Sequence, residues 1–331
     1  MPIPRAVIFG CAGPRLSPEE FDLFAQSNPW GFILFARNLE TPNQIATLCS
    51  DMRRAVGWHA PILIDQEGGR VERLGQPHWH SFAPPLDDAD HAQSERLFWT
   101  RGALIGSDLA AAGINVNCAP CCDVAVAKTH PFLRNRCYGT DRETVITHAK
   151  AMIAGHAHAG VASVIKHMPG HGRGTLDSHL ELPRVSASRQ DLEQDFAPFR
   201  ALADAPMAMT GHMVVEALDA ANPATQSKTV VEFMRTDIGF GGLIMTDDIS
   251  MNALAGTVVD RSLRALDAGC DTALHCNGDM DEMRALAAHV PVMSGGGLDR
   301  AKHACDTVPD ASAVDIPAIR AERAGMLGTR A

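Results

Sequence analysis

The sequence predicts an α/β protein made of a single (β/α)8 barrel with long βα loops, extending over residues 1–331 as one domain. Short apolar runs alternate with amphipathic stretches along the chain, and this alternation is typical of repeated β/α units around a parallel sheet. There are eight runs and eight intervening helical patterns. No Pro/Ser-rich linker divides the chain, and no GxGxxG turn follows an early strand, which disfavours a doubly wound sheet.

The strand candidates are short and rich in β-branched or other apolar residues, and polar residues follow them directly. In chain order they are Ala6–Phe9, Gly31–Phe35, Pro61–Ile64, Ile114–Cys118, Ala162–Lys166, Met207–Thr210, Gly242–Thr246 and Thr272–His275.

The helix candidates have apolar residues at helical spacing, and several follow a Ser, Thr or Asp that can cap the first turn. They are Pro18–Gln26, Pro42–Ala55, Glu95–Ala112, Arg142–Ala159, Arg189–Leu202, Lys228–Ile238, Arg261–Ala268 and Asp281–His289. One more helix, Val314–Met326, is expected to pack on the outside of the barrel. The glycines at 295–297 are interpreted as a flexible loop.

Composition restricts the classes of partner. Hydrophobic residues make up 46% of the chain and charged residues 21%, which suits a soluble globular protein. A net charge of −10 and the lack of a basic track argue against nucleic acid. The most apolar helical stretch, Leu97–Ile114, is interrupted by Arg101 and Asp108, so no membrane span is expected. The N-terminal segment lacks the pattern of a signal peptide.

The nine cysteines are scattered, which favours reduced thiols and a cytoplasmic location. Cys118 and Cys121 have CxxC spacing, but they close a strand candidate instead of opening a helix, and no second pair supplies zinc ligands. We interpret them as small buried residues at a strand end.

Polar side chains gather after the strand candidates, where a barrel carries its active site. The segment Lys166–His179 is the richest, with three histidines and Asp177 among several glycines. The spacing of these histidines matches no common zinc motif, and Lys166 would repel a cation, so we expect no metal. A metal-dependent hydrolase remains an alternative that loss of activity on chelation would favour.

Two further features point to acid–base and nucleophilic chemistry. In Asp177-Ser-His179 a carboxylate can orient the imidazole, which makes His179 a candidate general acid/base. Asp247 ends a strand candidate and is a candidate nucleophile, whereas Asp248 or Ser250 is expected to cap a following helix. Asp65 and Arg73 could grip vicinal hydroxyls, although a structural salt bridge would also explain them.

Five segments together resemble the bacterial β-N-acetylglucosaminidase branch of glycoside hydrolase family 3. They appear in the family's order between Phe9 and Asn277: GFILFARN, DQEGGRVERL, KHMPGHGRGTLDSH, GLIMTDDISM and LDAGCDTALHCN. The combination KHxPGHGxxxxDSH with a later TDDxSM is highly specific for the family.

The resemblance implies a retaining exo-β-N-acetylglucosaminidase, a single barrel that acts in cytoplasmic recycling of peptidoglycan without a cofactor. It assigns Asp247 as nucleophile, His179 as acid/base and Asp177 as the partner of His179. The sugar-binding residues that it implies are Asp65, Arg73, Arg136, Lys166 and His167. The match at Arg136 is looser, because Cys137 and Tyr138 replace the family's usual residues.

The expected substrate is a small GlcNAc-containing muropeptide of the GlcNAc-1,6-anhydroMurNAc type, handled by a monomer without nucleic acid or membrane partners. Two alternatives within the family are a β-glucosidase and a GlcNAc phosphorylase. Only the phosphorylase would form a sugar 1-phosphate, so products with and without phosphate would separate them. An alternative of another class is a non-catalytic barrel that binds cell-wall fragments, which would bind such fragments without turnover.

Overall fold

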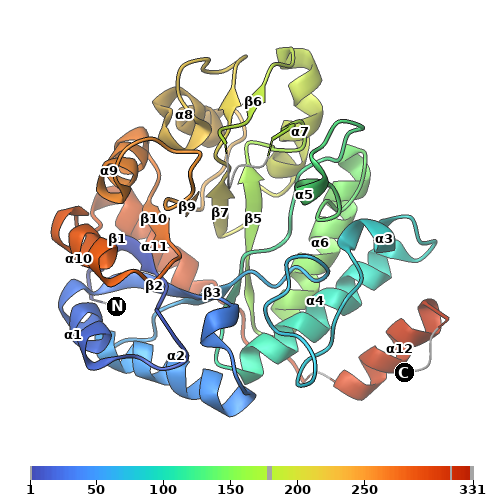
Figure 1. Ribbon diagram of the computed structural model, residues 1–331. Helices are drawn as coiled ribbons and strands as arrows, with labels where there is room; N and C mark the ends of the chain where they lie inside the picture. Colours follow the sequence, from blue (N-terminus) through green and yellow to red (C-terminus); the bar gives the residue numbers. More distant parts are fainter. Residues whose placement is uncertain (1, 177–180, 314, 329–331) are drawn as a thin grey trace.

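Eight parallel strands close into a barrel surrounded by helices (Figure 1), as the sequence predicts. The structure, a computed structural model, describes residues 2–176, 181–313 and 315–328. Around the barrel the order is β1-β10-β9-β7-β5-β4-β3-β2. The barrel strands are β1 (Arg5–Phe9), β2 (Pro29–Leu34), β3 (Ile62–Ile64), β4 (Val116–Asn117), β5 (Ala162–Met168), β7 (Met207–Thr210), β9 (Leu243–Asp248) and β10 (Thr272–His275).

Closure comes from pairing of the first strand with the last. Val7 of β1 lies opposite Ala273 of β10, and on its other side Ile8 lies opposite Gly31 of β2. With no free edge in the barrel, the carboxyl ends of all eight strands face the same way and surround one central area.

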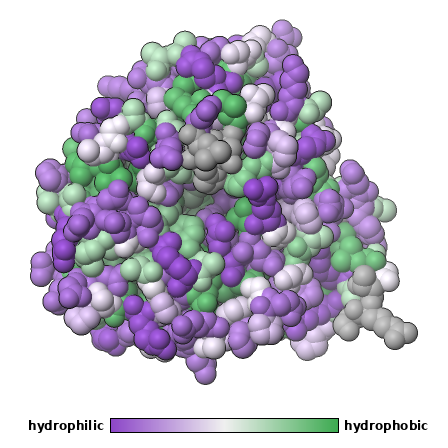
Figure 2. Space-filling model, in the orientation of Figure 1, coloured by the Kyte–Doolittle hydropathy of each residue, from purple (hydrophilic) through white to green (hydrophobic). Residues whose placement is uncertain are grey.

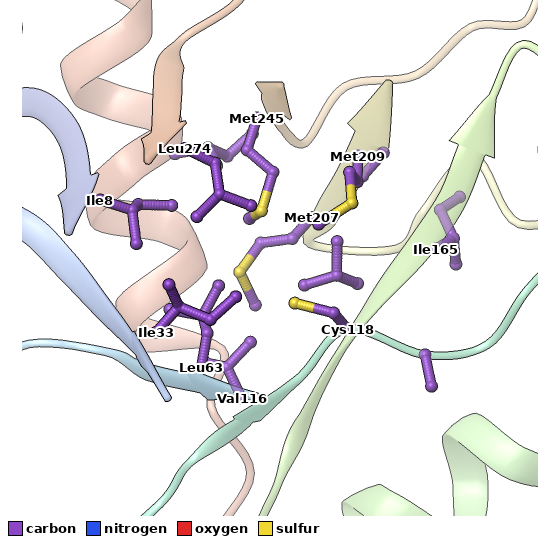
Figure 3. Close-up of a cluster of buried hydrophobic side chains, with 14 of the residues drawn as sticks. Ile8, Ile33, Leu63, Val116, Cys118, Ile165, Met207, Met209, Met245 and Leu274 are labelled. Carbon is purple, nitrogen blue, oxygen red and sulfur yellow. The ribbon is translucent and has the colours of Figure 1, made fainter. Parts of the chain in front are cut away.

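The interior of the barrel is filled by apolar side chains from most of the strands (Figure 3). Ile8, Ile33, Leu63 and Leu274 are almost fully buried there, and Cys118 packs in the same cluster. Cys118, Cys121 and Cys122 are free thiols with no exposed surface, so the interpretation of this segment as packing residues is confirmed. A close-packed core of this kind holds the strand ends, and therefore the first residues of the loops that follow them, in fixed positions.

The helices of the ring, with one exception, begin after a Ser, Thr or Asp whose side chain caps the first turn; the exception follows Gln93, whose side chain makes no capping bond. They are α1 (Pro18–Ser27), α2 (Pro42–Val56), α4 (Ser94–Ala111), α6 (Arg142–His158), α7 (Arg189–Ala201), α8 (Lys228–Thr236), α9 (Val258–Ala268) and α10 (Met280–His289). Helix α9 begins three residues before the predicted Arg261, because Thr257 and Asp260 form a capping box.

The interpretation of residues 295–297 as a flexible loop was wrong. They form the first turn of α11 (Gly295–Asp306), whose buried Ala301 and Ala304 hold it against the core. Packing of that face outweighs the poor helix propensity of glycine at the start of a helix. The predicted outer helix is α12 (Ile316–Met326), which lies beside α4 in Figure 1; Val314 is outside the described residues.

The long βα loops carry short elements that the sequence did not reveal. These are α3 (Pro85–Ala89), α5 (Pro131–Arg134), the 3-10 turns Ala36–Asn38 and Ala224–Gln226, and a small parallel sheet of β6 (Arg184–Val185) and β8 (Val214–Val215). Elements of two to five residues have too few positions to show a period. None of the described helices has the length and apolarity needed to cross a bilayer.

Candidate active site

A pocket opens at the carboxyl ends of the strands, and six of the residues proposed from sequence line it: Asp65, Arg73, Arg136, Lys166, His167 and Asp247. Figure 2 shows a hollow near the middle of this face. Asp65 follows β3, Lys166 and His167 lie in β5, and Asp247 lies in β9. The predicted catalytic residues Asp177 and His179 lie outside the described residues.

A buried network of ion pairs forms the floor of the pocket. The Lys166 ammonium lies 2.7 Å from Asp65 Oδ1 and 2.6 Å from Glu67 Oε1. Arg136 donates two parallel hydrogen bonds to Glu67, from Nε at 3.0 Å and from NH2 at 2.9 Å. Glu67 has no exposed surface. Burial by itself would raise the pKa of Glu67, but Arg136 and Lys166 hold this pKa well below its usual value.

The same network stabilises the charged forms of Lys166 and Arg136. Burial would lower the pKa of Lys166, but Asp65 and Glu67 raise it above its usual value, so the ammonium persists at neutral pH. Arg73 NH2 lies 3.9 Å from Asp65 Oδ2. The floor therefore presents alternating donors and acceptors, which suits the vicinal hydroxyls of a sugar.

His167 is held in one tautomer by a carboxylate that the sequence reasoning did not assign to the site. Its Nδ1 lies 2.7 Å from Asp123 Oδ2, and its Nε2 lies 3.2 Å from Arg136 NH2. Since the guanidinium only donates, Nε2 accepts and the ring proton is on Nδ1. Burial would raise the pKa of Asp123, but His167 and His171 lower it to about 2.

Asp247 is a partly exposed carboxylate whose pKa is below its usual value. Burial raises this pKa, and His212, His167, the Asp248 N–H and Lys166 together lower it. The Asp248 N–H donates to Asp247 Oδ1 at 2.8 Å. The acid is thus ionised at neutral pH, as a nucleophile requires.

His212, from the loop after β7, forms a hydrogen bond with the backbone at the end of β9. Its Nε2 lies 3.0 Å from the carbonyl oxygen of Asp248, and its Nδ1 lies 2.8 Å from Thr225 Oγ1. The expectation that Asp248 or Ser250 caps a helix was wrong. Asp248 Oδ1 instead accepts from the amides of Ser250 and Cys276, because a turn separates β9 from α9.

His171 also lines the pocket, beside His167. Its backbone N–H donates to Asp123 Oδ1 at 2.6 Å, and its buried Nε2 has no hydrogen-bond partner. Burial is the main cause that lowers the pKa of His171, to about 4, so the ring is neutral at neutral pH. Asp123 therefore positions the ring of His167 in β5 and the backbone of His171 in the loop that follows.

One group of described residues could hold a metal ion: Cys121, Asp123 and His167, whose ligand atoms lie within 4.8 Å of one another. They fit a metal poorly. Asp123 Oδ2 already accepts from His167 and lies 3.3 Å from Cys121 Sγ. The positive charge of the Arg136 guanidinium, beside His167, would repel a metal ion bound there.

The site residues that sequence reasoning missed are Glu67, Asp123 and His212, all fully buried. Each stands next to a predicted feature: Glu67 in DQEGGRVER, Asp123 after the cysteine pair and His212 after the sixth predicted strand. Charged residues at strand ends were a visible signal for them, but a buried partner cannot be told from a pocket residue by position alone. Cys137 and Tyr138, the two residues that made the family match at Arg136 looser, are buried, and Arg136 itself lines the pocket.

Comparisons with known proteins identify one family. Residues 11–300 match the family described as glycosyl hydrolase family 3 N terminal domain. The chain is 35% identical over 294 residues to the beta-hexosaminidase of Alkalilimnicola ehrlichii, covering 86% of this chain and 84% of that protein. It is also 35% identical over 272 residues to the beta-hexosaminidase of Vibrio cholerae serotype O1, covering 80% of this chain and 81% of that protein.

The solved structures agree with the sequence relatives. The crystal structure of NagZ from Neisseria gonorrhoeae in complex with N-trifluoroacetyl-D-glucosamine matches with a TM-score of 0.86 and 28% identity, over 98% of both chains. A glycoside hydrolase family 3 beta-N-acetylglucosaminidase from Paenibacillus matches with a TM-score of 0.79 and 29% identity, over 98% of this chain and 62% of that one.

Proposed function

The chain belongs to glycosyl hydrolase family 3, and from this premise we propose that it is a retaining exo-β-N-acetylglucosaminidase that removes terminal GlcNAc. The observation that carries the proposal is the pocket in which an ionised Asp247 faces a floor of sugar-binding groups. Relatives named beta-hexosaminidase support the activity, and a NagZ crystallised with an N-acylated glucosamine supports the sugar.

In the proposed mechanism Asp247 attacks the anomeric carbon while His179, paired with Asp177, gives its proton to the departing oxygen. The products of this step are a glycosyl ester on Asp247 and the free alcohol. Water then gives a proton to His179 and its oxygen to the anomeric carbon, and Asp247 leaves as a carboxylate. Two inversions retain the β configuration. The pKa of Asp247 below its usual value favours the attacking anion.

The sugar-binding roles follow from the donors and acceptors on the floor of the pocket. We assign Asp65 and Arg73 to neighbouring hydroxyls, and Lys166, His167 and Arg136 to the remaining polar groups of the ring. Their mutual ion pairs hold them in place before the sugar arrives, which reduces the ordering cost of binding.

The natural substrate that we propose is a GlcNAc-1,6-anhydroMurNAc muropeptide from peptidoglycan recycling, hydrolysed in the cytoplasm by a monomer with no cofactor. The support is the family's motif pattern and the similarity to NagZ. Incubation with a muropeptide digest and mass spectrometry of the products would test the substrate: release of GlcNAc supports the assignment, and intact muropeptide contradicts it.

The catalytic assignment is tested with 4-nitrophenyl β-N-acetylglucosaminide. We expect Asp247→Ala and His179→Ala each to lose roughly 10³-fold or more in kcat, because each removes a group used only in bond breaking. The matched control Asp281→Asn changes an exposed carboxylate on α10 and should keep full activity. Wild-type rates in both active-site variants would refute the assignment. A 5-fluoro-GlcNAc donor should leave a covalent label on the peptide that contains Asp247.

A further inference from the structure

Arg70 is an exposed cation at the edge of the pocket. Its guanidinium lies 4.5 Å from the centre of the Phe132 ring, and Phe132 lines the pocket. None of the described carboxylates forms an ion pair with Arg70, although the chain as a whole carries a net charge of −10. An unpaired guanidinium beside a pocket of this acidic protein suggests an anionic ligand.

The turn that carries Arg70 is fixed by tight packing. The amides of Glu67 and Gly68 both donate to the Val71 carbonyl oxygen, and the amide of Gly69 donates to that of Phe82. Gly68 and Gly69 have φ values of 88° and 68°. A Cβ on Gly69 would lie 2.7 Å from Pro84 Cα. Arg70 is therefore held at the tip of a turn whose shape its neighbours determine.

A stack of side chains connects the floor of the pocket to this turn. Glu67 binds Arg136, the Arg136 guanidinium lies 5.3 Å from the Phe132 ring centre, and Arg70 covers the same ring from outside. The charge of Arg136 is balanced by Glu67, whereas that of Arg70 has no carboxylate partner in the part of the chain that the structure describes. Leu176, which is 41% exposed, adds an apolar surface to the pocket lining.

We propose that Arg70, Phe132 and Leu176 form a subsite at the mouth of the pocket for a leaving group that carries a carboxylate. This inference rests on the proposed function, since the pocket of an exo-glycosidase holds the terminal sugar and its mouth meets the leaving group. A guanidinium stacked on an aromatic ring keeps its in-plane N–H groups available for a carboxylate, so Phe132 positions Arg70 while Leu176 covers the apolar part of the ligand.

The test compares 4-nitrophenyl with 3-carboxy-4-nitrophenyl β-N-acetylglucosaminide. The ratio of their kcat/KM values is measured for the wild type and for Arg70→Gln, so that differences in leaving-group reactivity cancel. We expect the ratio, carboxylated over plain, to fall by roughly twofold to fivefold in Arg70→Gln, as for an exposed ion pair. In the wild type, added salt should reduce the ratio in the same direction.

Arg54→Gln is the matched control, because Arg54 also covers a phenylalanine ring, that of Phe21, but lies in α2 on the outside of the barrel. Its ratio should equal that of the wild type. An unchanged ratio in Arg70→Gln, with the plain substrate still hydrolysed, would overturn the subsite. No hydrolysis of either substrate by the wild type would instead overturn the proposed function, and the subsite with it.

Inorganic phosphate is the other anion that this cation could bind. If phosphate speeds release of 4-nitrophenol, yields a sugar 1-phosphate and does neither in Arg70→Gln, then Arg70 serves an acceptor and the leaving-group subsite is wrong. Equal rates with and without phosphate, together with the lower ratio in Arg70→Gln, support the subsite.

Discussion

At the scale of residues, the pocket depends on buried charges that neutralise one another. Glu67 contacts no solvent but fixes two of the proposed sugar-binding residues, Lys166 and Arg136. Asp123 likewise binds the ring of His167, a third proposed sugar-binding residue, and accepts from the backbone N–H of His171. In the proposed function these carboxylates are positioning residues, because they act through the side chains and backbone that they orient.

Glu67→Gln should weaken sugar binding more than it slows bond breaking. The amide keeps the shape of Glu67 but leaves Lys166 and Arg136 with less negative charge to orient them, so we expect KM to rise by roughly tenfold or more. Steady-state kinetics separate KM from kcat, and thermal unfolding shows whether the variant is folded. The exposed Glu143→Gln is the control. An unchanged KM in a folded Glu67→Gln protein would refute the positioning role.

At the scale of elements, local signals predicted the helices and strands that are long enough to show a period. Ser17, Thr41, Asp141 and Ser188 each cap a helix at the predicted start. The misses have a common cause, since α3, α5, β6 and β8 have five residues or fewer and are shaped by their surroundings. Helix α11 was missed because its glycines resemble a loop while its apolar face is short.

The contact between α4 and α6 gives a prediction at this scale. A Cβ on Gly155 would lie 2.3 Å from the Trp99 carbonyl oxygen and 2.7 Å from the Ala103 amide nitrogen. We expect Gly155→Ala to lower the free energy of unfolding by roughly 1–3 kcal/mol, since the helices must separate to admit the methyl group. Chemical denaturation measures the change.

The control for this prediction is Gly325→Ala in α12. An added Cβ at Gly325 meets no atom within 4 Å, and the residue lies within the helix. Alanine should therefore raise the free energy of unfolding by about 0.5–1 kcal/mol, because it restricts the unfolded chain. A Gly155→Ala protein as stable as the wild type would show that α4 and α6 can admit the methyl group and would contradict the prediction.

At the scale of the whole molecule, buried histidines make stability depend on pH. His156 has no exposed surface, and burial lowers its pKa to about 3; its Nε2 accepts from Asn117 Nδ2 at 3.0 Å. The unfolded chain protonates this ring near pH 6.5 while the folded protein does not. Stability from His156 is therefore present above pH 6.5 and lost as pH falls toward 3. His171 acts in the same direction.

Asp195 acts in the opposite direction. Burial raises its pKa to about 6, so the folded protein binds this proton more tightly than the unfolded chain, and stability is lost as pH rises through the interval from about 4 to 6. Burial also lowers the pKa values of His212 and His148 and raises that of Asp108, so these histidines outnumber the carboxyls and leave a net loss of stability on acidification between pH 6.5 and 4.

The melting temperature of the wild type should therefore fall on acidification from pH 7 to 5. In His156→Gln the loss of unfolding free energy on acidification to pH 5.5 should be smaller by about 1 kcal/mol, and the fall in melting temperature correspondingly smaller, although the variant is less stable at pH 7. Thermal unfolding across this range checks it, with His303→Asn on the exposed face of α11 as the control. The same pH slope in His156→Gln and the wild type would contradict the prediction.

The sequence by itself determined the barrel, because the signals for strands, helices and caps lie within a few residues of one another. It also determined which strand ends carry Asp65, Lys166, His167 and Asp247, because polar residues at a strand end are visible in the chain. Only the tertiary structure decided which of these charges meet. Glu67 and Arg136 are separated by 69 positions, and closure of the barrel brings them to 2.9 Å. Burial then makes each charge depend on its partner, and no local pattern encodes that dependence.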